Sequence, residues 1–145
     1  MALPTYFVSH GGGPWPWMKE QTGGAYDRLE ASLAALRQAH GDAVRSVGSG
    51  LSFHNLRQFG PAGAMASRAF DGWLQETMAL APSARSAALL RWEEAPMARA
   101  AHPREEHLLP LMVALGAAEQ EPAACVYHEE DFFGSLTVSS FRFGS

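Results

Sequence analysis

Three histidines lie where a loop is expected to leave a strand or a helix is expected to begin. His10 ends a short apolar run and precedes three glycines, which let a ligand approach the backbone closely. His54 follows a Gly-Ser-Gly segment, and His107 stands in a segment that also contains two glutamates. Imidazole and carboxylate groups gathered in this way suit iron or zinc. Because the sequence has no short HxxxH or CxxC pair, spacing alone leaves a metal site and ordinary loop histidines as open interpretations.

The His-Gly-Gly-Gly segment also resembles the oxyanion loop of lipase-like hydrolases. That chemistry requires a serine in a G-x-S-x-G turn, and the best candidate, Gly50-Leu-Ser-Phe-His54, lacks the final glycine. The chain is also short for that fold. The hydrolase interpretation is therefore rejected.

The elements that must position these histidines alternate in type along the chain. Apolar and aromatic runs bounded by glycines predict strands, and apolar residues at helical spacing predict helices. The predicted order β-α-β-α-α-α-β-β indicates one α/β domain, with a reduced mixed sheet flanked by helices and a C-terminal antiparallel strand pair. The expected strands are 3–9, 43–47, 123–127 and 136–143, and the expected helices are 26–38, 67–80, 84–92 and one that starts within 101–110.

Four details of this pattern concern the candidate site. Ligands of open α/β sheets gather at the carboxyl ends of the strands, so His10 and His54 are expected to share one crevice. His107 is expected one turn into the fourth helix, which Pro110 should kink. His102, next to Pro103, is interpreted as a helix-entry residue. Trp15 and Trp17 could line a pocket for an aromatic ligand or pack in the core; both interpretations stay open.

Composition restricts the class of protein. The 145 residues include 47% hydrophobic side chains, enough for one domain with its own core. The formal net charge of −4 and the scattered arginines argue against nucleic-acid binding. The single cysteine fits a reducing compartment. The first residues lack a basic n-region, and no apolar stretch reaches about 20 residues. We therefore expect a cytoplasmic protein without a membrane partner.

Several segments together resemble one enzyme family, the class III extradiol ring-cleavage dioxygenases, and within it the DOPA-dioxygenase-like branch. The resemblance covers nearly the whole chain. The segments that carry it are Val-Ser-His-Gly-Gly-Gly-Pro at 8–14, Val-Gly-Ser-Gly-Leu-Ser-Phe-His-Asn-Leu-Arg at 47–57, Ala-His-Pro-Arg-Glu-Glu-His-Leu-Leu-Pro-Leu at 101–111, Gly-Ala-Ala-Glu at 116–119 and Val-Ser-Ser-Phe-Arg-Phe-Gly at 138–144.

The resemblance implies a non-haem Fe(II) or Zn(II) enzyme that opens a catechol ring with O₂. It implies that His10 and His107 are metal ligands and that His54 is the catalytic acid/base. An imidazole suits this last role because its ordinary pKa lies near working pH. Gly12 and Asn55 are predicted to contact the aromatic substrate.

The sequence departs from the family pattern in its length. The usual chain is nearly twice as long, so residues 1–145 are interpreted as a single extradiol-dioxygenase-like domain that is internally shortened near residues 30–45. The missing part includes the histidine that usually supplies another metal ligand. His54, Glu106 or a residue of a partner chain could replace that ligand. A homodimer or higher oligomer is expected, because lost strands would expose a sheet edge. The alternative function is a non-catalytic or partner-dependent remnant that binds metal or aromatic compounds.

Overall fold

One mixed four-stranded sheet forms the centre of the fold in the computed structural model, which describes residues 3–12 and 19–145. The strand order is β2-β1-β4-β3. Strands β1 and β2 pair in parallel, whereas β1–β4 and β3–β4 are antiparallel. The strands are β1 (Thr5–Ser9), β2 (Ser46–Gly50), β3 (Ala123–Phe132) and β4 (Leu136–Phe143). The predicted α/β class and the C-terminal antiparallel pair are confirmed.

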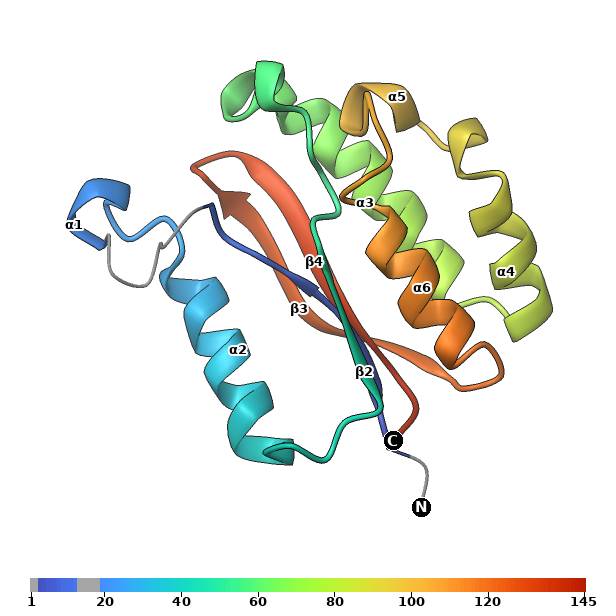
Figure 1. Cartoon of the computed structure of the whole chain (residues 1–145). Coiled ribbons are helices and arrows are strands. Elements are labelled where there is room, and N and C mark those ends of the chain that lie inside the picture. Colours follow the sequence, from blue (N-terminus) through green and yellow to red (C-terminus); the bar gives the residue numbers. More distant parts are fainter. Residues whose placement is uncertain (1–2, 13–18) are drawn as a thin grey trace.

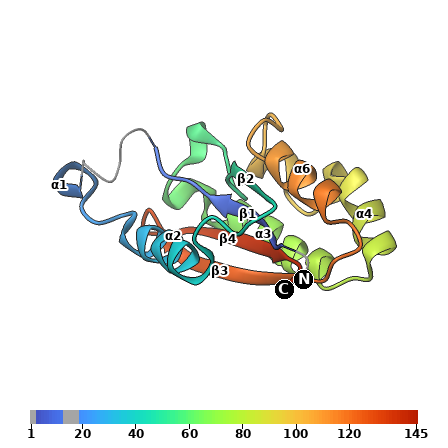
Figure 2. The ribbon, with the colours of Figure 1, turned by 60° about the horizontal axis from the view of Figure 1, so that its bottom comes forward.

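Helices cover the two faces of the sheet unequally (Figures 1 and 2). Helix α2 (Asp27–His40) lies on one face, and α3 (Ala64–Met78) and α6 (Leu109–Ala117) lie on the other, with α4 (Pro82–Leu90) outside them. Short elements complete the chain: α1 (Lys19–Thr22), α5 (Ala98–Ala101) and the 3₁₀ helices η2 (Leu56–Gln58), η3 (Pro61–Gly63) and η4 (Trp92–Glu94). No helix in residues 3–12 and 19–145 is long and apolar enough to cross a membrane.

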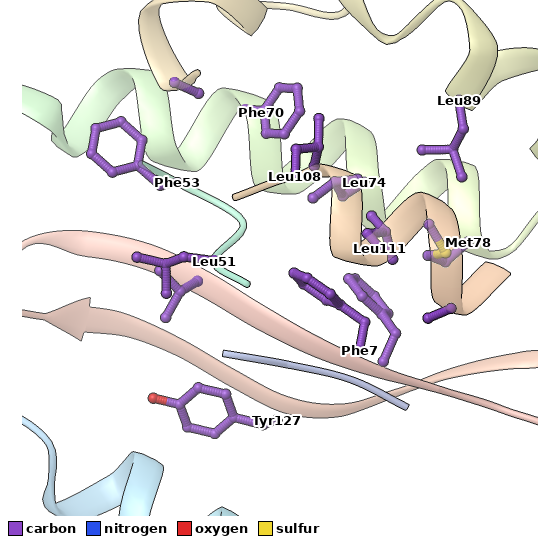
Figure 3. Packing of buried hydrophobic residues seen from close by; sticks show 14 of the residues in the cluster. Phe7, Leu51, Phe53, Phe70, Leu74, Met78, Leu89, Leu108, Leu111 and Tyr127 are labelled. Carbon is purple, nitrogen blue, oxygen red and sulfur yellow. The ribbon is translucent and has the colours of Figure 1, made fainter. Parts of the chain in front are cut away.

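The main core fills the space between the sheet and the α3–α6 layer (Figure 3). Phe7 of β1 is fully buried and meets leucines such as Leu74 and Leu111, which come from α3 and α6. Tyr127 lies on the opposite face, toward α2. Each fully buried side chain of this size contributes about 1.5–3 kcal/mol relative to exposure. This core therefore fixes the sheet against α3 and α6, and His10, His54 and His107 lie in the segments outside these helices.

The second strand lies later in the chain than its side chains suggest. The sequence predicts this strand at residues 43–47, but β2 spans Ser46–Gly50. Its glycines pack against the backbone before and within α6. A Cβ added to Gly48 would lie 2.3 Å from the carbonyl oxygen of Pro110. The glycines are strand residues because only they allow this approach.

The start of the last helix also differs from the prediction. Helix α6 begins at Leu109, with Pro110 in its first turn, so His107 precedes the helix and Pro110 does not kink it. Proline is favoured at this position because its missing N–H would have no helical partner there. The segment before α6 is thus a turn, and the backbone of His107 is available for contacts with β2.

The third strand is longer than the predicted 123–127, because it also includes the acidic residues that follow. Strand β3 continues through His128 and Glu130 to Phe132, and the chain turns at Phe133–Ser135 around Gly134, whose φ is +76°. β3 forms one edge of the sheet. Glu130 and Asp131 reach solvent from this edge strand, whereas the buried Glu129 accepts a hydrogen bond from the hydroxyl of Tyr127.

Candidate active site

Backbone hydrogen bonds join the three histidine-bearing segments near the carboxyl ends of β1 and β2. Figure 1 shows the end of β2 beside the segment between α5 and α6. The N–H of His10 donates to the carbonyl of Gly50 at 3.1 Å. The N–H of Leu51 donates to the carbonyl of His107, also at 3.1 Å, and the N–H of His54 donates to Ala101 at 3.0 Å. Residues more than 90 positions apart in the chain therefore share one rigid frame.

Close packing of β2 makes this frame possible. A Cβ on Gly50 would lie 2.3 Å from the carbonyl oxygen of His107 and 2.8 Å from the ring of Phe7. Real Cβ atoms do not approach other atoms so closely. The glycine thus lets the segment before α6 lie directly on the end of β2, which brings the ring of His107 to the other two.

The three imidazole rings converge. The ring centres of His54 and His107 are 3.5 Å apart with the planes nearly perpendicular, and those of His10 and His107 are 5.1 Å apart. His10 and His54 also border the same hollow. The expectation that His10 and His54 share one crevice is met, and His107 joins them although it is not on a strand end.

Burial and mutual proximity keep two of these rings neutral. Burial lowers the pKa of His54, and a positive charge on His10 would lower it further. Burial also lowers the pKa of His107, as do the neighbouring His54 and His10 rings. The exposed carboxylate of Glu106 opposes both shifts. At pH 7 the site therefore presents imidazoles with free lone pairs, which can accept a proton or bind a cation.

The comparison with protein families agrees with this arrangement. Residues 23–142 match the family described as the catalytic LigB subunit of aromatic ring-opening dioxygenase. The chain belongs to this family. The matched range includes His54 and His107, and His10 lies just before it. The resemblance to class III extradiol dioxygenases that the histidine segments indicated is confirmed.

This LigB-family chain is also similar to two individual proteins. It is 31% identical over 122 residues to a 4,5-DOPA dioxygenase extradiol of Beta vulgaris, a match that covers 81% of this chain and 43% of that protein. The crystal structure of an uncharacterized protein from Escherichia coli K12 is similar with a TM-score of 0.58 and 26% identity, over 91% of this chain and 51% of that one. The chain thus spans about half the length of these relatives.

The pair His10–His107 has the separation expected of two ligands of one ion. Two imidazoles bound at about 2.0–2.1 Å to a tetrahedral ion place their ring centres roughly 5 Å apart. The Nδ1–H of His10 donates to the carbonyl of Gly11 at 2.9 Å, which leaves Nε2 with its lone pair. The buried Nδ1 of His107 finds no hydrogen-bond partner among the described residues. His54 is too near His107 for both to bind the same tetrahedral ion in this arrangement.

The set of donors in this LigB-family chain is nevertheless incomplete. Among residues 3–12 and 19–145, no group of three or more His, Cys, Asp or Glu side chains is arranged to hold a metal ion. The described residues therefore fit one part of a metal site, the two-histidine part, and do not complete it.

A fourth histidine, His102, holds the segment that leads to His54. His102 is not a helix-entry residue: it ends α5, is fully buried, and packs against the rings of Phe70 and Trp92. Its Nε2–H donates to the carbonyl of Ser52 at 2.9 Å, two residues before His54. Burial lowers its pKa to about 4, so it stays neutral at pH 7. Sequence reasoning missed this role because nothing local to His102 indicates a contact 50 residues away.

The two predicted substrate-contacting residues have structural partners. The N–H of Gly12 donates to the hydroxyl of Tyr26 at 2.9 Å, and Gly12 borders the hollow beside His10. The side-chain amide of Asn55 donates to the carbonyl of Ala100 and accepts from the N–H of Arg57, which anchors the loop after His54. Contacts of Gly12 and Asn55 with substrate stay predictions. Trp15 and Trp17 lie outside the described residues.

Proposed function

We propose that this chain is an extradiol ring-cleavage dioxygenase, which opens a catechol-type aromatic ring with O₂ in a metal-dependent reaction. The observation that carries the proposal is the convergence of His10, His54 and His107 at one end of the sheet in a LigB-family chain. The name of the beet relative, an extradiol dioxygenase of DOPA, supports the catechol as substrate class.

Each of the three histidines has its own part in this reaction. His10 and His107 would hold a non-haem Fe(II) or Zn(II), because the distance between their rings suits two ligands of one ion and the Nε2 of His10 is free to bind. The ion, if bound, would supply Lewis-acid chemistry that activates the catechol. His54 lies in contact with His107 and is neutral, so it can take a proton from a catechol hydroxyl and return it later.

The missing part of the site has to come from elsewhere. Three sources fit the chain: movement of His54 toward the ion, the exposed carboxylate of Glu106, and a residue of a partner chain. His54 already contacts His107, and the charge of Glu106 already acts on the His107 ring. Variants at these two positions separate the three sources, because only the partner source leaves metal affinity unchanged in both His54→Gln and Glu106→Gln.

Oxygen uptake tests the proposed reaction. The protein is loaded with Fe(II) without air, then mixed with a panel of catechols and air, and we expect O₂ consumption with a yellow ring-opened product. His54→Gln should lower the rate about 10²- to 10⁴-fold, the usual contribution of a general acid/base. His40→Gln, at the end of α2 where His40 contacts Tyr6, is the matched control and should retain the rate. No O₂ uptake with any catechol would contradict the proposal.

A second candidate function is a non-catalytic module that binds a metal or an aromatic compound. The incomplete donor set among the described residues favours it. Metal stoichiometry in the wild type, compared with His10→Ala and His107→Ala, separates the candidates. Binding that depends on these histidines without any O₂ uptake would favour the second function.

A further inference from the structure

An open hollow, the α2 hollow, lies between helix α2 and the sheet, on the face away from the main core (Figure 2). Helix α2 borders it with three small side chains, Ser32, Ala35 and Ala39. Within residues 27–40, only Leu29 of this helix is buried. The small side chains thus leave a space that larger ones would fill.

The sheet forms the other wall of the α2 hollow. Arg142 of β4 stands directly opposite Tyr6 of β1 in the antiparallel pair. Side chains two residues apart on a strand share a face, so Ser140 and Val8 line the same wall. The hydroxyl of Tyr6 is already engaged by the Nε2 of His40 at 2.7 Å. The sheet wall therefore offers a ligand one guanidinium and one serine hydroxyl beside apolar side chains.

The guanidinium of Arg142 has no counter-charge in the described part of the chain. Its Nε is buried and finds no hydrogen-bond partner there. The arginines that form ion pairs among residues 3–12 and 19–145 are Arg28, Arg37, Arg45 and Arg99. The sequence of the remaining residues, 1–2 and 13–18, contains no acidic side chain. A partly buried cation without a partner is unfavourable, so this position favours an anion that the chain does not supply.

A carboxylate suits these donors. The planar guanidinium can hold both carboxylate oxygens through two parallel hydrogen bonds. The hydroxyl of Ser140 accepts the N–H of Ser9 at 2.9 Å, which leaves its own O–H to donate to a ligand. No acidic side chain from residues 3–12 and 19–145 lines the hollow, so none of its lining residues repels an anion.

The size and the apolar lining determine what the carboxylate is attached to. The volume of the α2 hollow is about 230 Å³. An apolar cavity of about 150 Å³ in another protein holds one benzene molecule. The α2 hollow therefore has room for one ring, or a short aliphatic chain, together with a carboxylate. An inorganic anion would leave the apolar side chains without a partner.

We propose that the α2 hollow binds a small organic monocarboxylate, whose carboxylate is held by Arg142 and Ser140. Its ring or short chain packs against Val8, Leu36 and Val126, which are the larger apolar residues of the lining. None of the three site histidines lines this hollow. The proposal therefore goes beyond the proposed dioxygenase reaction and does not depend on it.

Titrations at pH 7 test the ligand class. The whole chain, without added metal, is titrated with benzoate, hexanoate, benzamide and inorganic phosphate, and binding is followed by heteronuclear NMR. We expect both carboxylates to shift the backbone signals of Ser32, Ser140 and Arg142. Benzoate should bind at least tenfold more tightly than benzamide, because hydrogen bonds between charged groups contribute enough for this factor. Equal binding of benzamide, tighter binding of phosphate than of benzoate, or unchanged signals at these three residues overturns the proposal.

Removal of the cation tests the role of Arg142. Arg142→Met retains a long unbranched side chain and should lower the affinity for benzoate at least tenfold. Its midpoint of urea unfolding should not fall, because no ion pair is lost. Arg45→Met is the matched control: Arg45 is an arginine of the same sheet end that pairs with Glu121 and does not line the hollow. Its affinity for benzoate should equal that of the wild type. An unchanged affinity in Arg142→Met overturns the proposal.

Filling the space tests the location independently of charge. Ser32 is half-buried and lines the hollow, so Ser32→Leu should occupy the space of the ligand and lower the affinity for benzoate at least tenfold. Ala34→Leu is the matched control, because Ala34 is an exposed residue of the same helix outside the hollow. Leucine favours a helix at both positions. Benzoate affinity that is the same in both variants overturns the proposal.

Discussion

The free energy of unfolding should depend on pH through His102, the buried histidine that bonds the segment leading to His54. His102 has a pKa of about 4 in the folded protein, against an ordinary value of 6.5, because burial disfavours its charged form. Its Nε2–H is already donated to Ser52, so a second proton would have to enter at the buried Nδ1, which has no partner among the described residues. The folded state therefore favours the neutral form of His102.

The sign and size of the effect follow from this difference. A histidine whose pKa is lowered by folding contributes its full stability above pH 6.5 and loses it as the pH falls toward 4. Each pKa unit corresponds to about 1.4 kcal/mol, so the contribution of His102 amounts to about 3 kcal/mol. In a chain of this length, a loss of about 3 kcal/mol is a large part of the usual 5–15 kcal/mol.

The variant His102→Gln isolates this contribution. Glutamine retains an N–H that can reach Ser52 but cannot take up a proton. Urea unfolding, followed by fluorescence and circular dichroism from pH 7.5 to pH 4, gives the free energy of unfolding of both proteins. The variant should be less stable at pH 7.5, because ring packing against Phe70 and Trp92 is lost, and the gap should narrow by about 3 kcal/mol toward pH 4. A gap that does not change with pH would show that His102 is not held neutral by folding.

Two further variants test the frame of the site, and one measurement tests the oligomeric state. Gly50→Ala should cost about 1–3 kcal/mol of unfolding free energy and lower any activity, because its Cβ would meet the carbonyl of His107 at 2.3 Å; unchanged urea stability would contradict this close packing. Tyr26→Phe should cost about 1 kcal/mol, since it removes the hydroxyl that accepts the Gly12 N–H; an equally stable variant would show that this bond contributes nothing. Light scattering should give a dimer or larger oligomer, and a monodisperse monomer would contradict it, because neighbouring helices expose an apolar surface (Leu90, Leu109 and Val113).

The sequence pattern predicted those helices and strands whose conformation is determined by residues close by in the chain. The helix expected at 26–38 is α2 at Asp27–His40, and the strand expected at 136–143 is β4 over the same residues. Periodicity of apolar side chains succeeds here because the same residues that show the period face the core. The order of elements, and with it the α/β class, follows from these segments.

Predictions failed where a distant contact decides the local conformation. Gly48 and Gly50 are typical turn residues, and they form a strand because the backbone near Pro110 packs directly on them. His102 next to Pro103 indicates a loop, and its burial depends on Ser52, 50 residues away. The meeting of His10 and His54 could be predicted from strand ends, but the position of His107 depends on where α6 begins.

The proposed reaction depends above all on His10 and His107 binding one metal ion together in a LigB-family site. Zn(II) titration of protein with ¹⁵N-labelled histidines, followed by NMR of the ring nitrogens, observes this binding at the two residues themselves. We expect the ring signals of His10 and His107 to shift together and saturate at one Zn(II) per site, while those of His40 and His128 keep their positions. Signals of His10 and His107 that stay unchanged, or that shift at different Zn(II) concentrations, would rule out a shared ion.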